Sequence, residues 1–397
     1  MSTPTRVSLS SVVEINPRMP KDHGLQEDDH VSFLAMADIS EDGHVLQVQQ
    51  RSFGDVRKGY TPFKNGDVLL AKITPCFENG KATLIGELDS AWGFGSTEFH
   101  VLRPSDAIDG RYLFHLVWNE RFRAVAARNM TGSAGQKRVP ASFLEEQEIP
   151  LPSLAEQKRI AAILDKVDGI RRQRRESLKL NDDFLSAAFL EMFGDLESNS
   201  LGWQTIELGE LITEGPTNGL YVPATQYGHG TPILRIDGFY EGKILPGYPF
   251  KRVNIDQAQI DRFRIRDNSI IINRVNSKEY VGKAALVKHM TETTVFESNM
   301  MNFMIDTARA ELAFVVHQLG QPYVRRQIAT ARKDAVNQSS INQQDVKGLQ
   351  LRLPPLPLQQ RFTAIHNKIG EIVAARLSDL DSTDKLIATL QDRFFQP

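Results

Sequence analysis

The chain has 397 residues, with 47 Lys and Arg against 49 Asp and Glu, and a formal net charge of -2. A chain of this length is expected to form two or three domains of ~150 residues each. Its 41% hydrophobic and 24% charged residues are ordinary for a globular protein. The near-neutral total excludes a global basic field for nucleic-acid binding, so charge has to be examined locally.

Signals of a secreted or membrane protein are missing from the sequence. No stretch approaches 18 uncharged apolar residues, so no transmembrane helix is predicted. The N-terminal stretch MSTPTRVSLSSVVEINPR lacks a basic start followed by an apolar core, so we expect no secretory signal. The single cysteine, Cys76, excludes an intrachain disulfide and a Cys-rich zinc site. Together these features predict a cytoplasmic protein, since disulfides are rare in that compartment.

Residues 1–150 have the pattern of short strands and turns followed by a short helical stretch. Apolar runs such as DVLLAKI (67–73) alternate with Gly, Pro and Asn, which are typical of the turns between strands. The stretch GRYLFHLVWNERFRAVAA (110–127) then has a helical pattern. We therefore predict a globular first domain over residues 1–150.

A proline-led segment, LPSLAEQKRIAAILDKVDGI (151–170), predicts the start of a long helix. Its apolar residues recur at intervals of 3, 4 and 3, at Ile160, Ile163, Val167 and Ile170. This spacing places them on one face, as the seam of a coiled coil requires. Ser153 and Glu156 have the spacing of a capping box. A helix over 155–193 would be roughly 55–60 Å long.

The same helix is encoded a second time as LPPLPLQQRFTAIHNKIGEI (353–372), at an offset of 353 − 151 = 202. Its apolar stripe keeps the register, at Phe362, Ile365, Ile369 and Ile372. The offset continues backwards, where GKATLI (80–85) falls on GKAALV (282–287). One gapless offset therefore relates roughly residues 64–195 to 266–397, and chance does not produce a repeat of this extent.

The repeat predicts a doubled α+β architecture with four parts. These are a globular domain over 1–150, a long helix within 151–195, a second domain over 196–352 and a second long helix within 353–397. We expect the two helices to pack as an antiparallel coiled coil through Ile160, Ile163, Val167, Ile170, Phe362, Ile365, Ile369 and Ile372. The alternative is that each helix closes the core of its own domain.

Motifs for catalysis, metals and cofactors are absent from the sequence. It contains no phosphate-binding loop of the form G-x-x-x-x-G-K-[ST], no G-x-S-x-G and no H-E-x-x-H, and its nine histidines show no metal-ligand spacing. Asp67 and Glu98 with Lys72 or Lys81 could be imagined as a nuclease site, but such neighbours are common in a chain this rich in charge. We therefore predict no catalytic residues, no metal site and no cofactor of the chain's own.

Two local basic clusters occupy corresponding places in the two halves. Residues 51–81 contain six basic and three acidic side chains (+3), and residues 251–288 contain nine and four (+5). Lys and Arg neutralise phosphates, and Arg, Lys and Asn can bond base edges. The candidate DNA-binding residues are Arg51, Arg57, Lys58, Lys64, Lys72, Thr74, Lys81, Arg252, Arg262, Arg264, Arg274, Asn276, Lys278 and Lys283. The alternative is a solvated surface of strands and turns.

The halves diverge after equivalent starting elements, at INPRMPKDHGL (15–25) and TEGPTNGLYVPATQYGHGTPILRIDGF (213–239). Gly, Asn, Thr, Tyr and His suit exposed recognition loops. A repeated framework with different loops is expected of two readers of different targets.

The stretch GSAGQKRVPASFLEEQEIPLPSLAEQKRIAAILDKVDGI and its echo VNQSSINQQDVKGLQLRLPPLPLQQRFTAIHNKIGEI resemble the specificity (S) subunit of a Type I restriction-modification system. In that family a variable target-recognition domain precedes each proline-led helix, and the arrangement occurs twice. The resemblance covers essentially the whole chain. The second copy departs by having PLQQRF for AEQKRI, which puts in doubt any role for the Glu156 and Lys158 side chains.

The resemblance implies a non-catalytic subunit that binds double-stranded DNA. Each recognition domain would read half of a split sequence, and the antiparallel helices would hold the halves apart. Two methylation (M) subunits, carrying S-adenosylmethionine, would dock on the helices, and restriction (R) subunits, using ATP and Mg, would join them, with no membrane involved. The alternatives are a self-contained restriction or methylation enzyme acting on DNA, and a purely structural coiled-coil adaptor.

Overall fold

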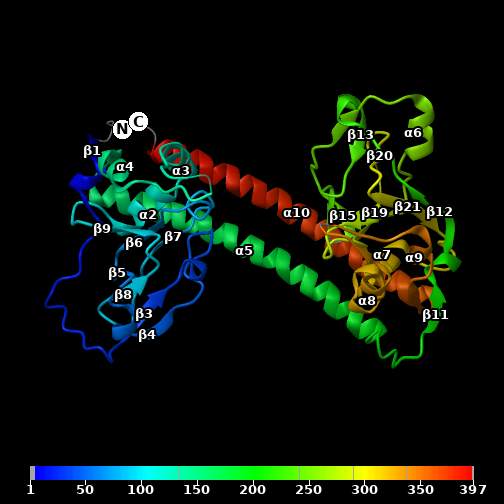
Figure 1. Cartoon of the computed structure of the whole chain (residues 1–397), viewed down its shortest axis with the longest axis horizontal. Helices are drawn as coiled ribbons and strands as arrows, with labels where there is room; N and C mark the ends of the chain where they lie inside the picture. The colour runs from blue at the N-terminus through cyan, green and yellow to red at the C-terminus, as the bar shows by residue number, and fades with distance from the viewer. Residues whose placement is uncertain (1–4, 134, 241, 289, 337, 396–397) are drawn as a thin grey trace. The chain divides into compact units, whose positions relative to one another are not determined.

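The computed structural model describes residues 5–133, 135–240, 242–288, 290–336 and 338–395, and Figure 1 draws its helices and strands. The chain divides into two compact units: unit 1 is Met1–Glu176 with Leu377–Pro397, and unit 2 is Ser177–Arg376. The long helices α5 (Leu154–Phe193) and α10 (Leu356–Phe395) cross these boundaries. Each unit therefore contains the start of one long helix and the end of the other. In the described part of the chain, no helix is long and apolar enough to cross a membrane.

Unit 1 contains two four-stranded sheets and a two-stranded pair. The first sheet has the order β2 (Val13–Ile15), β9 (Phe99–Pro104), β6 (Val68–Ala71), β7 (Ala82–Leu84). The second has the order β4 (Gln49–Ser52), β3 (His30–Leu34), β8 (Gly93–Gly95), β5 (Thr61–Phe63). β1 (Thr5–Ser8) pairs with β10 (Glu148–Leu151), the strand that leads into α5. The shorter helices are α1 (Phe53–Val56), α2 (Gly110–Trp118), α3 (Glu120–Arg128) and α4 (Ala141–Glu146).

The core of unit 1 forms where α2 packs on the first sheet. All four residues of β6 are buried, as the continuous apolar run in DVLLAKI indicates. α2 buries seven of its nine residues, and the Asp109 side chain caps it by accepting from the Tyr112 N–H at 3.0 Å. The Tyr112 hydroxyl donates to the carbonyl of Pro150 at 2.8 Å. This bond fastens the segment before α5 to the core.

Unit 2 has a six-stranded sheet in the order β12 (Ile212–Asn218), β21 (Met300–Ile305), β17 (Ser269–Asn273), β19 (Ala284–Val287), β15 (Gly242–Ile244), β14 (Phe239–Tyr240). Two three-stranded sheets run β16 (Lys251–Val253), β13 (Tyr227–Leu234), β20 (Val295–Phe296), and β18 (Val275–Asn276), β23 (Ser339–Ser340), β22 (Lys333–Asp334). β11 (Gln204–Glu207) pairs with β24 (Gln350–Leu353). The shorter helices are α6 (Gln257–Phe263), α7 (Leu312–Gly320), α8 (Pro322–Ala331) and α9 (Gln343–Lys347).

The two units share one strand order. β2-β9-β6-β7 in unit 1 corresponds to β12-β21-β17-β19 in unit 2, and β4-β3-β8 corresponds to β16-β13-β20. The repeat thus extends over the N-terminal segments that no gapless offset relates. A residue with positive φ followed by proline also recurs, as Asn16 (φ 54°) before Pro17 directly after β2, and as Gly215 (φ 88°) before Pro216 within β12. The predicted doubled α+β architecture is what the chain forms.

Each long helix is fastened at its start by a buried glutamine of the repeated motif. In unit 1 the Gln157 side chain is fully buried and makes three hydrogen bonds. Its Oε1 accepts from the Asp109 N–H at 2.8 Å, and its Nε2 donates to the carbonyls of Pro152 at 2.9 Å and Ala107 at 3.1 Å. One side chain therefore joins the proline-led segment to the loop before α2.

Gln359 makes the equivalent bonds in unit 2. Its Oε1 accepts from the Glu311 N–H at 2.9 Å, and its Nε2 donates to the carbonyls of Pro354 at 2.8 Å and Arg309 at 3.5 Å. A buried amide needs all of these partners, because an unpaired polar group in the interior is costly. This explains why the glutamine is repeated where its neighbours differ.

The predicted capping box at the start of α5 forms only in part. Ser153 Oγ accepts from the Glu156 N–H at 3.4 Å, as expected. The Glu156 carboxylate instead pairs with Arg159, its Oε1 and Oε2 accepting at 2.6 and 2.7 Å. The arginine lies one turn further along the helix and offers a charged partner.

The predicted apolar stripes begin in the cores of the units. Ile160 in unit 1 and Phe362 in unit 2 are buried among the residues of their own sheets and helices. Ile163, Val167 and Ile365 are half-buried and Ile369 is buried. Ile170 and Ile372 are 38% and 39% exposed, so the stripe does not continue as a buried seam at these two positions. The start of each helix thus closes the core of its own unit.

Within each unit, the start of one long helix lies beside the end of the other. In unit 2 the Phe362 ring of α10 lies 5.2 Å and 5.7 Å from the rings of Phe189 and Phe193 of α5. In unit 1, Leu390 and Phe394 of α10 pack against the cluster that contains Ile160 of α5. The two helix ends in each unit are therefore antiparallel.

Candidate nucleic-acid interface

Two of the predicted DNA-binding lysines point into their own units. Lys81 Nζ donates to the carbonyl of Met36 at 3.0 Å, and Lys283 Nζ, at the equivalent position, donates to that of Ile236 at 3.1 Å. The Lys283 ammonium also lies 4.8 Å from the centroid of the Phe239 ring, and burial lowers its pKa. Because both ammonium groups are engaged inside the fold, Lys81 and Lys283 are removed from the candidate interface.

The remaining candidates of the first cluster lie on separate elements. The Arg51 guanidinium stacks 3.7 Å from the centroid of the Phe33 ring on the sheet β4-β3-β8-β5. Arg57 follows α1 and forms an ion pair with Glu27 at 2.7 Å. Lys58 and Lys64 are exposed on the turns that follow.

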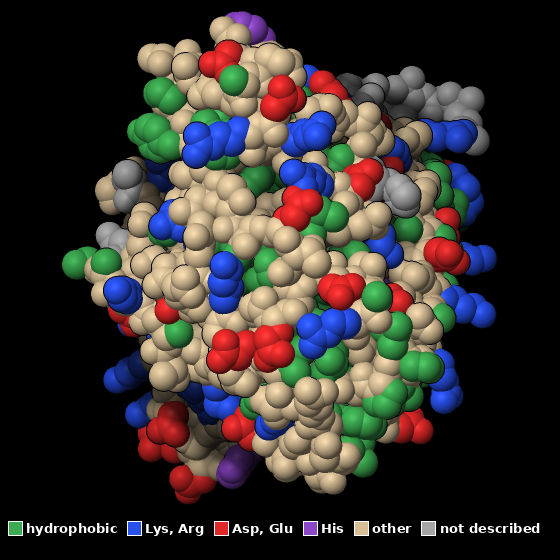
Figure 2. All heavy atoms as spheres, turned by 90° about the vertical axis from the view of Figure 1, so that its right-hand side faces the viewer, with side chains coloured by type: hydrophobic (Ala, Val, Ile, Leu, Met, Phe, Trp, Pro, Cys, Tyr) green, Lys and Arg blue, Asp and Glu red, His purple; other side chains and the backbone are tan. Residues whose placement is uncertain are grey.

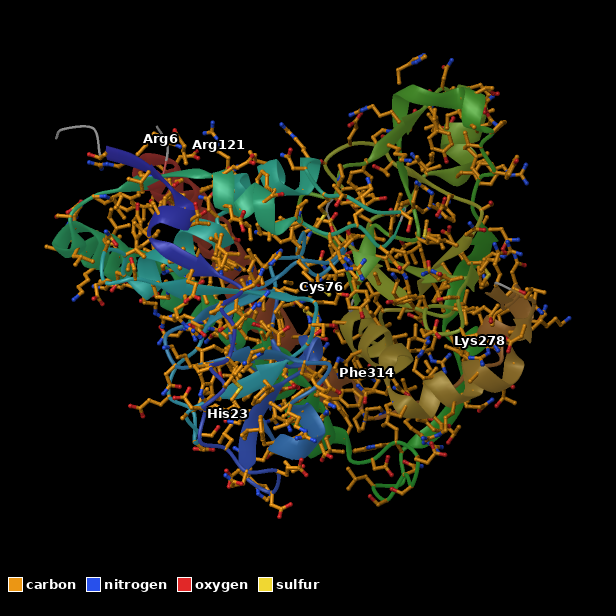
Figure 3. All side chains as sticks on the ribbon, turned by 60° about the vertical axis from the view of Figure 1, so that its left-hand side comes forward. Arg6, His23, Cys76, Arg121, Lys278 and Phe314 are labelled. Atoms are coloured by element: carbon orange, nitrogen blue, oxygen red, sulfur yellow. The ribbon has the colours of Figure 1, made fainter. Side chains whose placement is uncertain are left out.

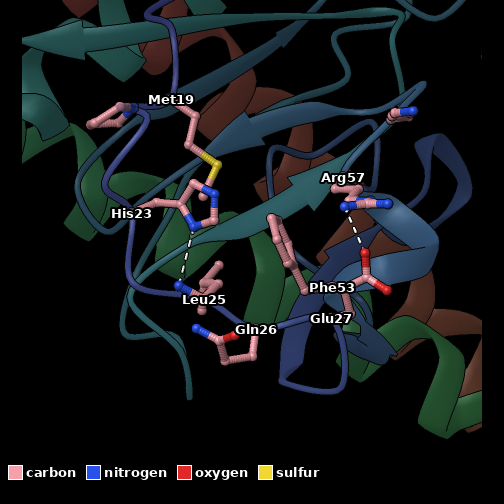
Figure 4. Close-up of a pocket in the computed structure, with 9 residues that line it drawn as sticks. Met19, His23, Leu25, Gln26, Glu27, Phe53 and Arg57 are labelled. Atoms are coloured by element: carbon pink, nitrogen blue, oxygen red, sulfur yellow. Dashed lines mark hydrogen bonds and ion pairs between the residues drawn. The ribbon is translucent and has the colours of Figure 1, made fainter.

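Figure 4 shows a pocket of about 380 Å³ beside Arg57 in unit 1. It is lined by Met19, Pro20, His23, Leu25, Gln26, Glu27, Phe53, Arg57 and Lys58. The His23 ring stands edge-on to Phe53 at 4.9 Å, and its Nδ1 accepts from the Leu25 N–H at 3.1 Å. Most of this lining belongs to the segment after β2, where the two halves diverge.

The candidates of the second cluster are also spread over unit 2. Arg252 forms a bidentate pair with Glu292, with both distances 2.8 Å. Arg274 donates to the carbonyl of Ser298 at 3.0 Å. Arg262 and Arg264 are exposed at the end of α6 and just after it. Surface ion pairs of this kind still leave an arginine able to exchange its carboxylate for a phosphate, because they contribute little stability.

A narrow antiparallel ribbon follows α3 in unit 1. This ribbon 1 comprises residues 131–133 and 135–138. The N–H groups of Thr131 and Arg138 donate to each other's carbonyls at 2.9 and 2.8 Å. The Thr74 N–H donates to the carbonyl of Lys137 at 2.9 Å. The ribbon thus lies against Thr74, which the sequence predicts to bind DNA.

Ribbon 1 is anchored at its base by Glu98. The carboxylate accepts from Arg138 Nη2 at 2.7 Å and Nε at 2.9 Å. These hydrogen bonds hold the pKa of the Glu98 carboxyl below its ordinary value, and the charge of Lys72 lowers it further. The predicted residue Lys72 therefore lies in the same group as Thr74 and the ribbon.

Unit 2 carries the same device, ribbon 2, in its sheet β18-β23-β22. Ribbon 2 comprises residues 333–336 and 338–340. Lys333 pairs with Ser340 in antiparallel register, and Ser339 pairs with Asn276 on β18. The predicted residue Asn276 therefore lies beside ribbon 2, as Thr74 lies beside ribbon 1.

Asp334 anchors ribbon 2. It accepts from Ser339 Oγ at 2.6 Å and pairs with Arg332 Nε at 3.0 Å and Lys278 Nζ at 3.2 Å. The Ser339 hydroxyl lowers the pKa of the Asp334 carboxyl, and the two cations lower it further. The predicted residue Lys278 is thus fixed at the base of this ribbon.

The structure groups some of the predicted residues around each ribbon and leaves the others apart. Ribbon 1 lies beside Lys72 and Thr74. Ribbon 2 lies beside the segment that contains β18, with Arg274, Asn276 and Lys278. The ribbons were not among the predicted DNA-binding residues, because they begin 50 residues (131 − 81) and 45 residues (333 − 288) after the basic clusters end. The available signal was the polar stretch with Gln136, which repeats as Gln338.

The surface carries both signs of charge. On the face drawn in Figure 2, Lys and Arg side chains are interspersed with Asp and Glu side chains. The labelled side chains of Arg6, Arg121 and Lys278 in Figure 3 are exposed, whereas Phe314 is buried in unit 2. Candidate phosphate-binding groups therefore have to be sought locally, for example at the ribbons.

Asp67 and Glu98, the carboxylates of the imagined nuclease site, have arginine partners. Asp67 is buried and accepts from Arg103 Nε and Nη2 at 2.8 and 2.7 Å, and Glu98 holds Arg138. Within the described ranges, no group of three or more His, Cys, Asp or Glu could hold a metal ion. The fold uses these acids to brace strands and a ribbon.

Comparison with known proteins agrees with this architecture. Residues 1–180 match the family model of the Type I restriction modification DNA specificity domain. The EcoEI specificity subunit from Escherichia coli is 39% identical over 290 residues, covering 64% of this chain and 48% of that protein. The EcoAI specificity subunit from Escherichia coli is 41% identical over 179 residues, which covers 43% of this chain and 30% of that protein. The chain spans half or less of the length of these two relatives.

Two solved structures share the fold over 99% of this chain, each with a TM-score of 0.57. One is the S subunit of a Type I restriction-modification system from M. genitalium, which is 15% identical, and the match covers 96% of that subunit. The other comes from work on assembly and conformational transition of the type I R-M system, and is 20% identical and covered to 97%. The chain is thus similar in sequence and in fold to specificity subunits of type I restriction enzymes, and the resemblance predicted from its repeated motifs is confirmed.

Proposed function

We propose that the chain is a DNA sequence-specificity subunit that reads a bipartite target, with one half-site bound by each unit. The doubled fold carries this proposal, since two units with the same framework differ in the segments after their first sheet strand. Specificity subunits are also the relatives of the chain over both the first unit and the whole fold. Acting on DNA, the subunit would work in the cytoplasm.

The two long helices would set the distance between the half-sites. A helix of 40 residues is about 60 Å long. Half-sites on one face of B-DNA lie about 34–36 Å apart per turn, so a rigid protein spacer fixes the number of intervening base pairs. In this proposal the two long helices together act as the spacer.

The chemistry would belong to partner subunits. Two methylation subunits with S-adenosylmethionine would dock on the helical regions, and restriction subunits using ATP and Mg would join the assembly. Buried carboxylates paired with arginine, as at Asp67, are consistent with a chain that contributes recognition and no catalysis.

The experiment is a footprint of the chain reconstituted with its methylation subunits on random-sequence DNA. We expect protection of two short motifs separated by a spacer of fixed length. Deleting seven residues from each long helix should change the spacer and leave both motifs intact. A single continuous motif, or binding without sequence preference, would contradict the proposal.

A further inference from the structure

Val336, at the tip of ribbon 2, is the most exposed large apolar side chain among the described residues. It is 99% exposed, and the next, Tyr221, is 76% exposed. A single exposed apolar residue is ordinary on a protein surface. The position of Val336 matters because the ribbon beneath it is held by hydrogen bonds and an ion pair.

Contacts at the base of ribbon 2 hold its two strands together and fasten them to the neighbouring loop. The Ala335 N–H donates to the carbonyl of Gln338 at 2.7 Å, which closes the ribbon around Val336. Asp334 ties the strands to each other through Ser339 and to the neighbouring loop through Lys278. A side chain presented by a braced ribbon loses little conformational entropy when it makes a contact.

The shape and chemistry of ribbon 2 fit the major groove of DNA. That groove admits a two-stranded β-ribbon, and the thymine 5-methyl group is the apolar feature displayed there. Lys333 and Gln338 are exposed on either side of Val336. A cation and an amide beside an apolar tip can bind phosphate and base edges while the tip packs on a methyl group.

The two ribbons share residues along their strands and differ in the residue at the tip. Gln136 of ribbon 1 recurs as Gln338 of ribbon 2. The positive charge of Lys72, beside ribbon 1, recurs as that of Arg274, beside ribbon 2. At the tip, the sequence has Ala134 where ribbon 2 has Val336, and Ala134 lies outside the described residues. Two ribbons with similar strands and different tips suit two DNA half-sites, which have the same sugar-phosphate backbone and different bases.

We propose that ribbon 2 enters the major groove of the half-site bound by unit 2, and that Val336 packs against the 5-methyl group of a thymine there. This contact rests on the proposed DNA-reading function. It makes Val336 a specificity-determining residue, because the methyl group distinguishes thymine from every other unmodified base in that groove.

The test uses the complex reconstituted with methylation subunits and duplexes in which each thymine of that half-site is replaced singly by uracil. Uracil lacks only the methyl group, so the base pair is otherwise unchanged. For the wild-type complex we expect one replacement to weaken binding about three- to fivefold, as for loss of one buried methyl group. Val336→Ala should weaken binding to unmodified DNA about as much and should be indifferent to uracil at that position.

The matched control is Val125→Ala, an exposed valine on α3 of unit 1 that is 39% exposed. It should retain the full sensitivity of the wild type to uracil. Because Val336 contacts so little of the protein, its replacement leaves the fold unchanged, and the same melting temperature in both variants verifies this. The contact is overturned if Val336→Ala binds unmodified DNA as tightly as wild type, or responds to uracil as wild type does at every position. A wild-type complex without sequence preference overturns the proposed function itself.

Discussion

The guanidinium of Arg376, on α10, donates to the main-chain carbonyl of Ser177, on α5, at 3.0 Å within unit 2. The equivalent residue of unit 1, Arg174 on α5, bonds the carbonyl of Asp379 on α10. Both pairs obey the offset of 202, so the contact is repeated with the helices exchanged. Each of the two arginines thus bonds the backbone of the opposite long helix.

We expect Arg376→Ala to lower the free energy of unfolding by about 1.5–3 kcal/mol, the usual contribution of a hydrogen bond to a charged group. Chemical denaturation of the full chain, followed by circular dichroism, measures this change. Lys368→Ala, an exposed residue of the same helix, is the control and should change stability by less than about 0.5 kcal/mol. Equal effects of the two substitutions would contradict a structural role for the arginine.

Gln157→Leu should destabilise unit 1 strongly. The substitution keeps the approximate volume and removes three hydrogen bonds from a buried site, leaving the Asp109 N–H and two carbonyls unpaired. The expected loss in free energy of unfolding is about 2–5 kcal/mol. Each unpaired buried group costs about 1–3 kcal/mol, and the total is reduced because some of these groups bond to water instead. Denaturation curves check the value. Gln360→Leu, on an exposed position of α10, should stay close to wild type.

Glu98 should make the stability of unit 1 depend on acid pH. The Arg138 guanidinium lowers the pKa of this carboxyl in the folded state below its ordinary value of 4.5. The carboxylate therefore stabilises the fold above pH 4.5, and this contribution is lost as the pH falls through the lowered pKa. Glu98→Gln should be less stable than wild type at pH 7, with the difference shrinking below pH 4.5. Melting temperatures across this range, with Glu87→Gln as control, measure it, and a constant difference would contradict the pairing.

Lys278→Ala should weaken DNA binding by the reconstituted complex without changing the sequence of either half-site. A lysine that neutralises one phosphate contributes about one unit to the slope of log affinity against log salt. We therefore expect this slope to fall by about 1. Lys385→Ala, whose partner Asp381 lies on the same helix, should leave the slope unchanged. A selective loss at one base pair would instead assign Lys278 to base reading.

Phe395→Ala should loosen unit 1, although the residue is near the end of the chain. Its ring lies 5.4 Å from that of Tyr112 in the core of unit 1. Removing a half-buried ring costs less than the ~3–5 kcal/mol of a fully buried one. Hydrogen exchange should accelerate in α2 and stay unchanged in unit 2. Acceleration in both units would mean that the two unfold together.

The sequence was sufficient for the doubled architecture and for the long helices, because a repeat and a 3–4 periodicity are properties of the chain itself. The ends of α5, Leu154 and Phe193, lie within one residue of the predicted 155–193. The partner of the Glu156 carboxylate could not be predicted in the same way, since the Arg159 guanidinium and the Ser153 backbone N–H compete for it and only geometry decides between them.

The candidate interface was less predictable, because a basic residue in the sequence carries no direction. Lys81 and Lys278 are both lysines within a basic cluster of the sequence. The Lys81 side chain bonds a main-chain carbonyl of its own unit, whereas the Lys278 side chain is exposed at the base of ribbon 2. Which lysine faces solvent depends on how sheets pack, and strand pairing brings Thr74 and Lys137 together from 63 positions apart (137 − 74). Such non-local pairings leave no periodic trace in the sequence.

The division of the chain into units has a consequence for biosynthesis. Unit 2 is one continuous stretch, Ser177–Arg376, whereas unit 1 needs Leu377–Pro397 in addition to its first 176 residues. On the ribosome, the segment that completes unit 1 is therefore made after all of unit 2. Unit 2 has all its residues first, and the first 176 residues stay incompletely covered until Leu377–Pro397 follow.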